Sequence, residues 1–176
     1  MAAVVVSSCQ QISSPCRAEG MADMEFLDVS DLRTGEISLR LARTCGEDPV
    51  RKRVPAYYFD IIDRHGNNVG SCDLRLGHTE GTYYGGNIGY AVNEEYRGRH
   101  YAKKACKLLF KLAKRHGMEY LYITCQPHNI PSRKTCEALG GVLVEIAELP
   151  EDNEMRVNDG HTCECIYLFN LTTGRI

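Results

Sequence analysis

The sequence is short of the features that define several large classes of protein. It has no apolar run near the roughly 18 residues of a membrane span, so we expect no membrane contact. Its formal net charge is -2 at pH 7, and the basic excess typical of nucleic-acid-binding proteins is missing. A hydrophobic fraction of 43% and a length of 176 residues suit one ordinary globular domain.

The nine cysteines lack the arrangement of a disulfide or metal framework. Six lie in segments with helix or strand patterns: Cys72, Cys106, Cys125, Cys136, Cys163 and Cys165. Such positions are typical of small buried hydrophobic side chains in a reduced, cytoplasmic protein. The close pair Cys163 and Cys165 has no second cluster to complete a metal site. We therefore expect a cytoplasmic location and no bound metal.

The N-terminal stretch differs in character from the rest of the chain. It has no basic region at its start, and the apolar run from Ala2 to Val6 is too short for a signal peptide. We expect a disordered extension over residues 1–24 and a single folded domain over residues 25–176.

Alternating and β-branched patterns predict strands along the whole domain. The predicted strands are Glu36–Ala42, Ala56–Asp63, Val69–Leu76, Tyr83–Asn93, Tyr120–Cys125, Val142–Ile146 and Thr162–Asn170. Within the fourth, Gly85, Gly86 and Gly89 indicate a bulge or the close approach of another backbone. The acidic stretch from Glu148 to His161 is predicted to be a loop.

Two segments have the period of a helix. The longer runs from about Arg99 to His116, with an apolar stripe that includes Leu108 and Leu112. Pro131–Leu139 is predicted to be a shorter helix, ended by Gly140. The order of elements has a strand–helix–strand–helix–strand core. It predicts an α/β domain with a mixed, mostly antiparallel seven-stranded sheet.

The turn that opens the long helix is a candidate phosphate site. A helix N-terminus exposes unpaired N–H groups and the positive end of the helix dipole, which suits a phosphate or pyrophosphate. Nearby positive charge comes from Arg97, Arg99, His100, Lys103 and Lys104. Taken alone, this segment is equally well interpreted as a solvated helix start with incidental basic residues.

A second segment, one unit further along, decides between these interpretations. Asn129-Ile-Pro-Ser132 follows a predicted strand and opens the next helix, which Asn129 is placed to cap. Together with Leu139-Gly-Gly141, the two segments resemble the GNAT acetyltransferases. That family has Arg/Gln-x-x-Gly-x-Gly/Ala before its long helix and Asn-x-x-Ser/Ala after the next strand. The resemblance is strongest from Ile88 to Ile146.

The resemblance implies a site for acetyl-CoA. The coenzyme pyrophosphate would be held by the backbone of Arg97, Gly98, Arg99, His100, Tyr101 and Ala102. The pantetheine arm would pair, as an added strand, with the backbone of Tyr90, Ala91 and Val92. The thioester would lie where the fourth and fifth strands splay apart, with an N–H near Val92 polarising its carbonyl. Asn129 and Ser132 would also contact the coenzyme, although Asn129 could be a helix cap alone.

Three positions depart from the family pattern. His100 stands where the pattern has a glycine, and Cys136 stands where the family often has a tyrosine acid. The helix pair that family members carry between their first two strands is missing, because only the short segment Arg43–Pro55 connects them. We therefore expect an open acceptor site, which a second chain could complete in a homodimer.

Two residues are candidates for catalysis. Cys136 could protonate the leaving thiolate, because the ordinary cysteine pKa of about 8.5 should resemble that of the coenzyme thiol. Packing of its helix is the alternative role. Asp73 is a candidate general base, with an ion pair to Arg75 as the favoured alternative. His78 and Glu80 lie in the following loop and are most simply solvated.

The sequence therefore predicts an N-acyltransferase that moves an acetyl group from acetyl-CoA to an amine by direct attack, with no metal or nucleic acid involved. The alternative is a non-catalytic module that binds acyl-CoA or another protein. The acidic residues between Glu148 and His161 favour a cationic amine only weakly, because such loops are common. The sequence does not specify the acceptor.

Overall fold

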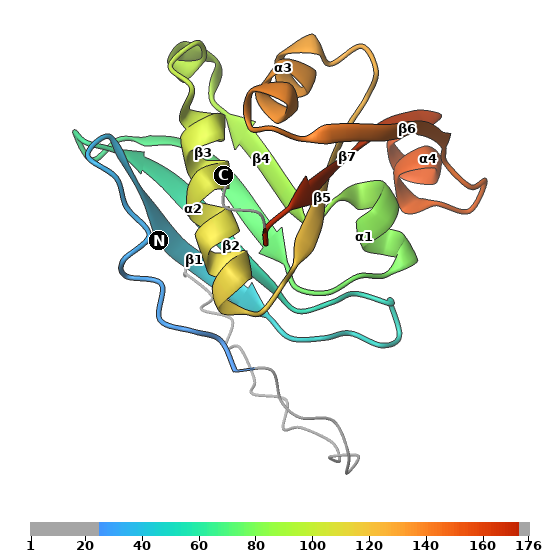
Figure 1. Cartoon of the computed structure of the whole chain (residues 1–176), viewed down its shortest axis with the longest axis horizontal. Coiled ribbons are helices and arrows are strands. Elements are labelled where there is room, and N and C mark those ends of the chain that lie inside the picture. Colours follow the sequence, from blue (N-terminus) through green and yellow to red (C-terminus); the bar gives the residue numbers. More distant parts are fainter. Residues whose placement is uncertain (1–24, 173–176) are drawn as a thin grey trace, which may run out of the picture.

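The computed structural model describes residues 25–172, so the disorder expected for residues 1–24 falls on a part of the chain outside the described residues. In chain order (Figure 1) the elements are β1 (Ile37–Cys45), β2 (Ala56–Asp63), β3 (Asn68–Arg75), α1 (Glu80–Gly85), β4 (Ile88–Val92), the short 3-10 helix η1 (Glu94–Tyr96), α2 (Tyr101–Arg115), β5 (Tyr120–Cys125), α3 (Ile130–Ala138), β6 (Val142–Glu148), α4 (Glu154–Asp159) and β7 (Cys163–Asn170). None of the described helices is long and apolar enough to cross a membrane.

The strands form two antiparallel sheets, which corrects the expectation of one seven-stranded sheet. The first sheet has the order β1-β2-β3-β4 and the second the order β5-β7-β6. From Ile88 to Val92, β4 pairs with β3, and the sheet ends there. β4 and β5 therefore present facing edges that do not form a continuous ladder. The α/β class and the antiparallel pairing agree with the sequence prediction.

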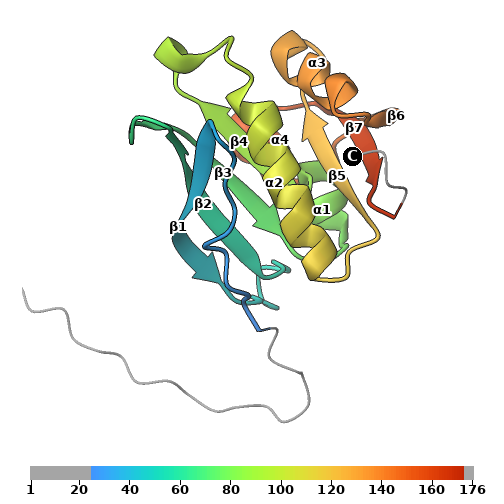
Figure 2. The same ribbon diagram turned by 60° about the vertical axis from the view of Figure 1, so that its left-hand side comes forward.

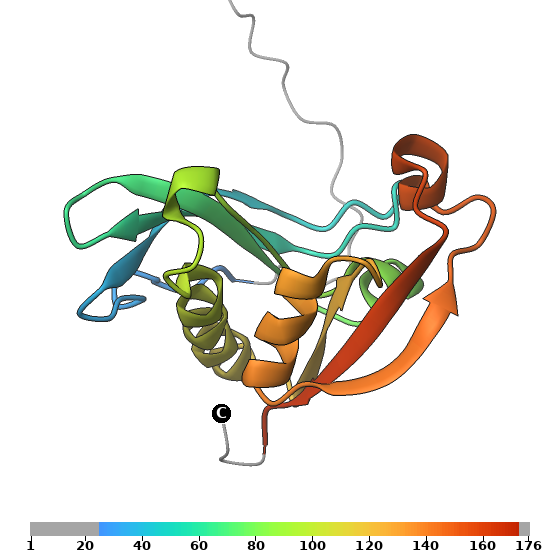
Figure 3. The same ribbon diagram turned by 90° about the horizontal axis from the view of Figure 1, so that it is seen from above.

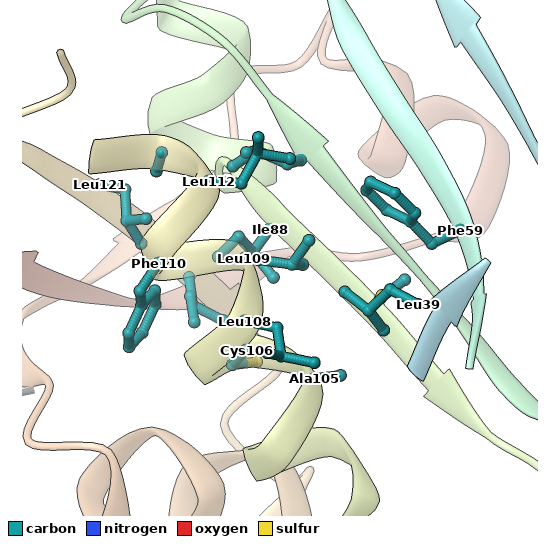
Figure 4. Close-up of a cluster of buried hydrophobic side chains, with 14 of the residues drawn as sticks. Leu39, Phe59, Ile88, Ala105, Cys106, Leu108, Leu109, Phe110, Leu112 and Leu121 are labelled. Carbon is teal, nitrogen blue, oxygen red and sulfur yellow. The ribbon is translucent and has the colours of Figure 1, made fainter. Parts of the chain in front are cut away.

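The core lies between the two sheets, around α2. Figure 2 shows α2 crossing between the first sheet and β5. Seven of its residues are buried: Ala105, Cys106, Leu108, Leu109, Phe110, Leu112 and Ala113. Figure 4 shows several of these side chains facing Leu39 and Phe59 of the first sheet and Leu121 of the second. The first sheet and the second sheet both bury apolar surface of α2, and this burial is the main force that holds the two sheets against the helix.

The connection between β1 and β2 contains no helix, as expected from its length. Residues 46–55 instead form a loop in which the backbones of Asp48 and Arg53 exchange two hydrogen bonds of 2.9 Å. Figure 3 shows α2 and α3 side by side on one flank of the molecule. The opposite flank carries the short helices α1 and α4 (Figure 3), and the connection between β1 and β2 adds no helix to it.

Helix α1 replaces the first part of the predicted fourth strand. Thr79 accepts a hydrogen bond from the Thr82 N–H at 3.2 Å, and the Thr82 hydroxyl accepts one from the Thr79 N–H at 2.8 Å. This reciprocal capping box starts a helix in a segment whose tyrosines favour a strand. The strand begins only at Ile88, after Gly86 has turned the chain with a φ of 73°.

The predicted loop from Glu148 to His161 also contains a helix. Asn153 accepts a hydrogen bond from the Met155 N–H at 3.0 Å and caps α4. Gly160, with a φ of 71°, ends the helix in the left-handed conformation. Both signals are local, and the acidic character of the segment concealed them.

Asn87 joins the two sheets at one point. Its backbone N–H donates to the Tyr122 carbonyl at 2.7 Å, and its side-chain oxygen accepts from the Tyr122 N–H at 2.9 Å. Its amide nitrogen donates to the carbonyls of Arg75 at 3.1 Å and Gly77 at 2.8 Å. The side chain is fully buried, so a buried amide links β5 to β3 and to the turn before α1.

We predict that Asn87→Ala destabilises the fold strongly, because it leaves the Tyr122 N–H and the Arg75 carbonyl without their side-chain partner and leaves the Gly77 carbonyl only the Thr82 hydroxyl as a donor. Each such group costs about 1–3 kcal/mol, so the free energy of unfolding should fall by about 3 kcal/mol or more. Denaturant unfolding measures the change. The control is Asn93→Ala, which removes one exposed hydrogen bond of 3.1 Å to Asn68 and should cost about 1 kcal/mol or less. Equal losses in the two variants would contradict this role of Asn87.

Candidate active site

The turn between β4 and α2 presents backbone N–H groups at the surface. Gly98 has a φ of 81°, and His100, the residue before the helix, has a φ of 60° and a ψ of 25°. His100 therefore takes a left-handed conformation that glycine adopts with little strain. The Lys104 N–H donates to the His100 carbonyl at 3.1 Å, so the N–H groups of residues 101–103 face the open end of the helix.

Some of the basic side chains around this turn bind backbone carbonyls, and others are exposed to solvent. Arg97 folds back, with its Nε donating to the Val92 carbonyl at 3.2 Å, and Lys104 donates to the Arg99 carbonyl at 3.1 Å. Arg99 and His100 are exposed beside the helix start. Adjacent N–H donors and exposed positive charge at a helix N-terminus are a donor set that fits a diphosphate.

A pocket of about 260 Å³ lies between β4 and β5. Its walls include Gly89 and Tyr90 of β4, Thr124 of β5, and Asn129 and Ser132 at the start of α3. Three of the predicted coenzyme residues, Tyr90, Asn129 and Ser132, are thus brought together around one cavity. The others, Ala91, Val92 and residues 97–102, follow β4 toward the N-terminus of α2.

The backbone N–H and carbonyl groups of Val92, in β4, point into the gap between the sheets. The Asn93 N–H donates to Val69 of β3 at 2.9 Å. Because successive N–H groups alternate in direction along a strand, the Val92 N–H points away from β3 and toward the gap. The Val92 carbonyl, on the same side, accepts the hydrogen bond from Arg97.

Tyr90 ties β4 to α3 across this gap. Its hydroxyl lies 2.8 Å from the Ser132 hydroxyl, and burial raises the pKa of Tyr90 well above its ordinary value. Asn129 caps α3, because its side-chain oxygen accepts from the Ser132 N–H at 3.2 Å. The capping role predicted for Asn129 is therefore confirmed, and the cap faces the pocket.

Cys136 does not line the pocket. It is fully buried on α3, and Cys125 of β5, rather than Cys136, lines the cavity. A hydrogen bond to Cys125, together with burial, raises the pKa of the Cys136 thiol far above its ordinary value. These surroundings favour the packing role over proton transfer.

Asp73 forms the ion pair with Arg75 that was the favoured alternative to a catalytic role. The Asp73 Oδ2 lies 3.1 Å from the Arg75 Nε, but it is buried without an aligned hydrogen bond, so the contact is one of charge. Burial raises the pKa of Asp73, and the Arg75 charge opposes that rise. Arg75 also donates to the carbonyls of Gly85 at 2.6 Å and Gly86 at 3.0 Å, which braces the turn before β4.

His78 is not brought to the pocket between the sheets. Its ring stacks on Tyr120, with centroids 4.0 Å apart and planes 7° apart. It lines a different cavity of about 290 Å³, near His116 at the other end of α2. Glu80, in the first turn of α1, is exposed.

Two residues that the sequence did not single out as catalytic complete the pocket. His161 and Glu164 line it from the side of α4 and β7, and the His161 Nδ1 lies 2.8 Å from the Glu164 Oε1. The one available signal was the charge of Glu164 inside the otherwise apolar strand pattern Cys163–Phe169. Its partner could not be identified, because His161 lies in a segment interpreted as loop.

Two edge strands that separate, a turn with exposed N–H groups before α2 and a capped α3 are thus combined in one α/β fold. The sequence model of the acetyltransferase (GNAT) domain matches residues 24–142, and the chain belongs to the GNAT acetyltransferase family. A comparison with curated protein sequences finds no significant match.

Solved structures of the family share this fold. A GNAT acetyltransferase from Bacillus anthracis is 24% identical, with a TM-score of 0.52 and coverage of 65% of this chain and 66% of that one. A ribosomal-protein-S5-alanine acetyltransferase from Vibrio fischeri is 18% identical, with a TM-score of 0.54 and coverage of 69% and 64%. The microcin C7 self-immunity acetyltransferase, solved with acetyl-CoA and AMP, is 20% identical, with a TM-score of 0.52 and coverage of 65% and 61%. The chain thus spans just under two thirds of the length of these structures.

We predict that His100→Gly stabilises the protein. His100 and Lys52 are the described non-glycine residues with positive φ, and the left-handed conformation costs an ordinary residue about 1–2 kcal/mol. The His100 side chain makes no capping hydrogen bond that glycine would lose. The free energy of unfolding should therefore rise by about 1 kcal/mol, while the neighbouring control Arg99→Gly should lower it. A loss of stability in both variants would contradict the strain at His100.

Proposed function

We propose that the protein is an N-acetyltransferase that transfers the acetyl group of acetyl-CoA to an amine. The observation that carries this proposal is the gap between β4 and β5 in a chain of the GNAT family. Asn87 closes the gap at one end, and the exposed N-terminus of α2 lies beyond the other. A site of this form suits a long ligand with a reactive end in the pocket and a diphosphate at the helix.

The coenzyme residues follow from this placement. The backbone of residues 97–102 would hold the pyrophosphate, with Arg99 and His100 adding charge. The free edge of β4, from Tyr90 to Val92, would pair with the pantetheine arm. Asn129 and Ser132 would border the arm from α3. When bound, the coenzyme supplies the activated acetyl thioester.

The chain itself would supply alignment and stabilisation of charge. The Val92 N–H, which points into the gap, is placed to stabilise negative charge on the carbonyl oxygen of the acetyl group. The walls of the pocket would hold the acceptor amine against the carbonyl carbon, which converts a bimolecular step into one within a complex. No covalent enzyme intermediate is required for direct attack.

The acceptor would approach from the flank of α1 and α4. The connection over residues 46–55 is short and adds no helix to this flank beside the short α1 and α4. We propose an open acceptor site here, and a second copy of the chain could complete it as a homodimer. The described cysteines are all free, which supports the proposal of a reducing, cytoplasmic location.

The alternative function is a coenzyme-binding module without turnover. It is favoured by Cys136, which stands in place of the family's tyrosine and is fully buried. The two functions are separated by measuring release of the coenzyme thiol from acetyl-CoA in the presence of polyamines, aminoglycosides, amino sugars, amino acids and alanyl or seryl peptides. Binding of acetyl-CoA without thiol release from any of these amines would favour the module.

We predict that acetyl-CoA raises the melting temperature and that Gly98→Leu reduces this effect. Ligand at a hundredfold excess over its Kd stabilises the native state by about 2.7 kcal/mol. A Cβ at Gly98 meets no protein atom within 4 Å, so a leucine there would occupy the space proposed for the phosphates. The variant should weaken acetyl-CoA binding by about tenfold or more, as measured by thermal shift and calorimetric titration.

The matched control is Gly66→Leu, in the hairpin between β2 and β3. Gly66 has a φ of 87°, close to the 81° of Gly98, and its Cβ would also meet nothing within 4 Å. Both variants should lose similar stability through backbone strain, but Gly66→Leu should keep its affinity for acetyl-CoA. If both variants bind equally well, the phosphate site lies elsewhere.

We predict that Cys136→Ser keeps turnover close to that of the wild type. The thiol is fully buried and does not line the pocket, and the interaction with Cys125 together with burial raises its pKa, which makes it a poor proton donor. Loss of a general acid would instead lower kcat by roughly a hundredfold or more without a change in acetyl-CoA affinity. Steady-state kinetics beside a binding titration distinguishes the outcomes, and a selective loss of kcat would restore Cys136 as the acid.

A further inference from the structure

The wall of the pocket on the side of α4 and β7 carries a histidine held by a carboxylate. His161 follows the left-handed Gly160 at the end of α4, and its N–H donates to the Met155 carbonyl at 3.1 Å. Glu164 lies near the start of β7, with a side chain only 4% exposed, while the His161 side chain is 29% exposed. The imidazole therefore stands between a buried carboxylate and the open cavity.

The 2.8 Å contact orients the imidazole, and an ionised Glu164 would select its Nδ1–H tautomer. An ionised Glu164 accepts the Nδ1–H of His161, so Nε2 of the neutral ring is left as the proton acceptor. Burial raises the pKa of Glu164, and the hydrogen bond from His161 opposes that rise. The other titratable groups near Glu164 are His128, before α3, Cys125 of β5 and Cys165 of β7.

The pair faces the place proposed for the thioester. His161 and Glu164 line the same cavity of about 260 Å³ as Gly89 and Tyr90 of β4 and Thr124 of β5. The coenzyme would enter this cavity from the side of α2 and α3. An acceptor that enters from the flank of α4 would therefore pass His161 before it meets the acetyl group.

We propose that His161, positioned by Glu164, is the general base that takes a proton from the acceptor amine. This inference rests on the proposed function. His161 would touch the substrate and act as a catalytic residue, whereas Glu164 acts through His161 and is a positioning residue. The expected acceptor is a primary amine that arrives as an ammonium ion, because the neighbouring carboxylate favours a cation at this side of the pocket.

The proton balance of the reaction defines what His161 must do. The ammonium gives one proton to the His161 Nε2, and its freed lone pair forms the C–N bond to the acetyl carbonyl carbon. The C–S bond breaks and its electron pair leaves on the coenzyme sulfur. The nitrogen loses its second proton as the amide forms, and the thiolate takes up one proton. One proton is released to solvent through His161, and no oxidant or further reactant is needed.

The decisive variants are His161→Ala and Glu164→Gln, with His128→Ala as the matched control. We expect His161→Ala to lower kcat by roughly a hundredfold to ten-thousandfold, with acetyl-CoA affinity unchanged. Imidazole added to this variant should restore part of the rate, which a purely structural role of His161 would not allow. The control should keep the activity and the pH profile of the wild type.

The pH profile tests the positioning role of Glu164. The rate should rise with pH as His161 loses its proton. Glutamine can still accept the Nδ1–H, but it no longer stabilises the protonated ring, so the acidic limb of the profile should move to lower pH in Glu164→Gln. In the free protein, NMR titration of the His161 ring should show an Nδ1–H tautomer and the same downward movement of its midpoint, without any coenzyme present.

The outcomes separate this inference from the proposed function. If acetyl-CoA neither binds nor is consumed by the wild type, the proposed function fails. If the wild type is active and His161→Ala matches it in rate and pH profile, the base lies elsewhere and only the present inference fails. An Nε2–H tautomer of His161 in the free protein, or loss of the acidic limb in His128→Ala instead, would also overturn it.

Discussion

The buried amide of Asn87 is the constraint on which the arrangement of the site depends. It binds β5 to the first sheet at one point, through both its backbone and its side chain. Beyond that point, β4 pairs with β3 and β5 pairs with β7, so the two sheets separate. The N-termini of α2 and α3 follow the far ends of β4 and β5, which places both helix starts at the open side of the gap. Because the two sheets are joined at one end only, a cavity lies between β4 and β5, and the N-termini of α2 and α3 border it.

Two carboxylates near this gap, the partly buried Asp73 and the buried Glu164, show how the ion-pair partner determines the role of a carboxylate. Burial raises the pKa of both Asp73 and Glu164. Asp73 is paired with Arg75, whose guanidinium is held by the carbonyls of Gly85 and Gly86. Arginine is a fixed charge and not a proton-transfer group. Glu164 is paired with His161, the one side-chain type that ordinarily titrates near neutrality. The first pair therefore suits bracing of a turn, and the second suits proton transfer.

The sequence predicts those elements whose signal is local and periodic. The strands Ala56–Asp63 and Tyr120–Cys125 were predicted with their observed bounds, and α2 was predicted within two residues at its start. The helices α1 and α4 were missed because short capping motifs at Thr79 and Asn153 outweigh the strand-like or loop-like composition around them. The division into two sheets and the pairing of His161 with Glu164 depend on tertiary contacts, which no local pattern encodes. The turn at residues 97–102 and the Asn129 cap were found because each is a short motif with its own chemistry.

In the proposed reaction, the removal of a proton from the acceptor is a larger task than the protonation of the leaving group. An alkyl ammonium has a pKa of about 10.4, so freeing its lone pair at pH 7 costs about 4.6 kcal/mol. A thiol of pKa about 8.5 leaves as a thiolate only about 2 kcal/mol above its protonated form at the same pH. Removal of the ammonium proton is therefore the larger task, and a group that performs it contributes more than a donor to the sulfur. The pocket carries a carboxylate-held imidazole at His161 on the acceptor side and a buried thiol behind its other wall, which matches that order of need.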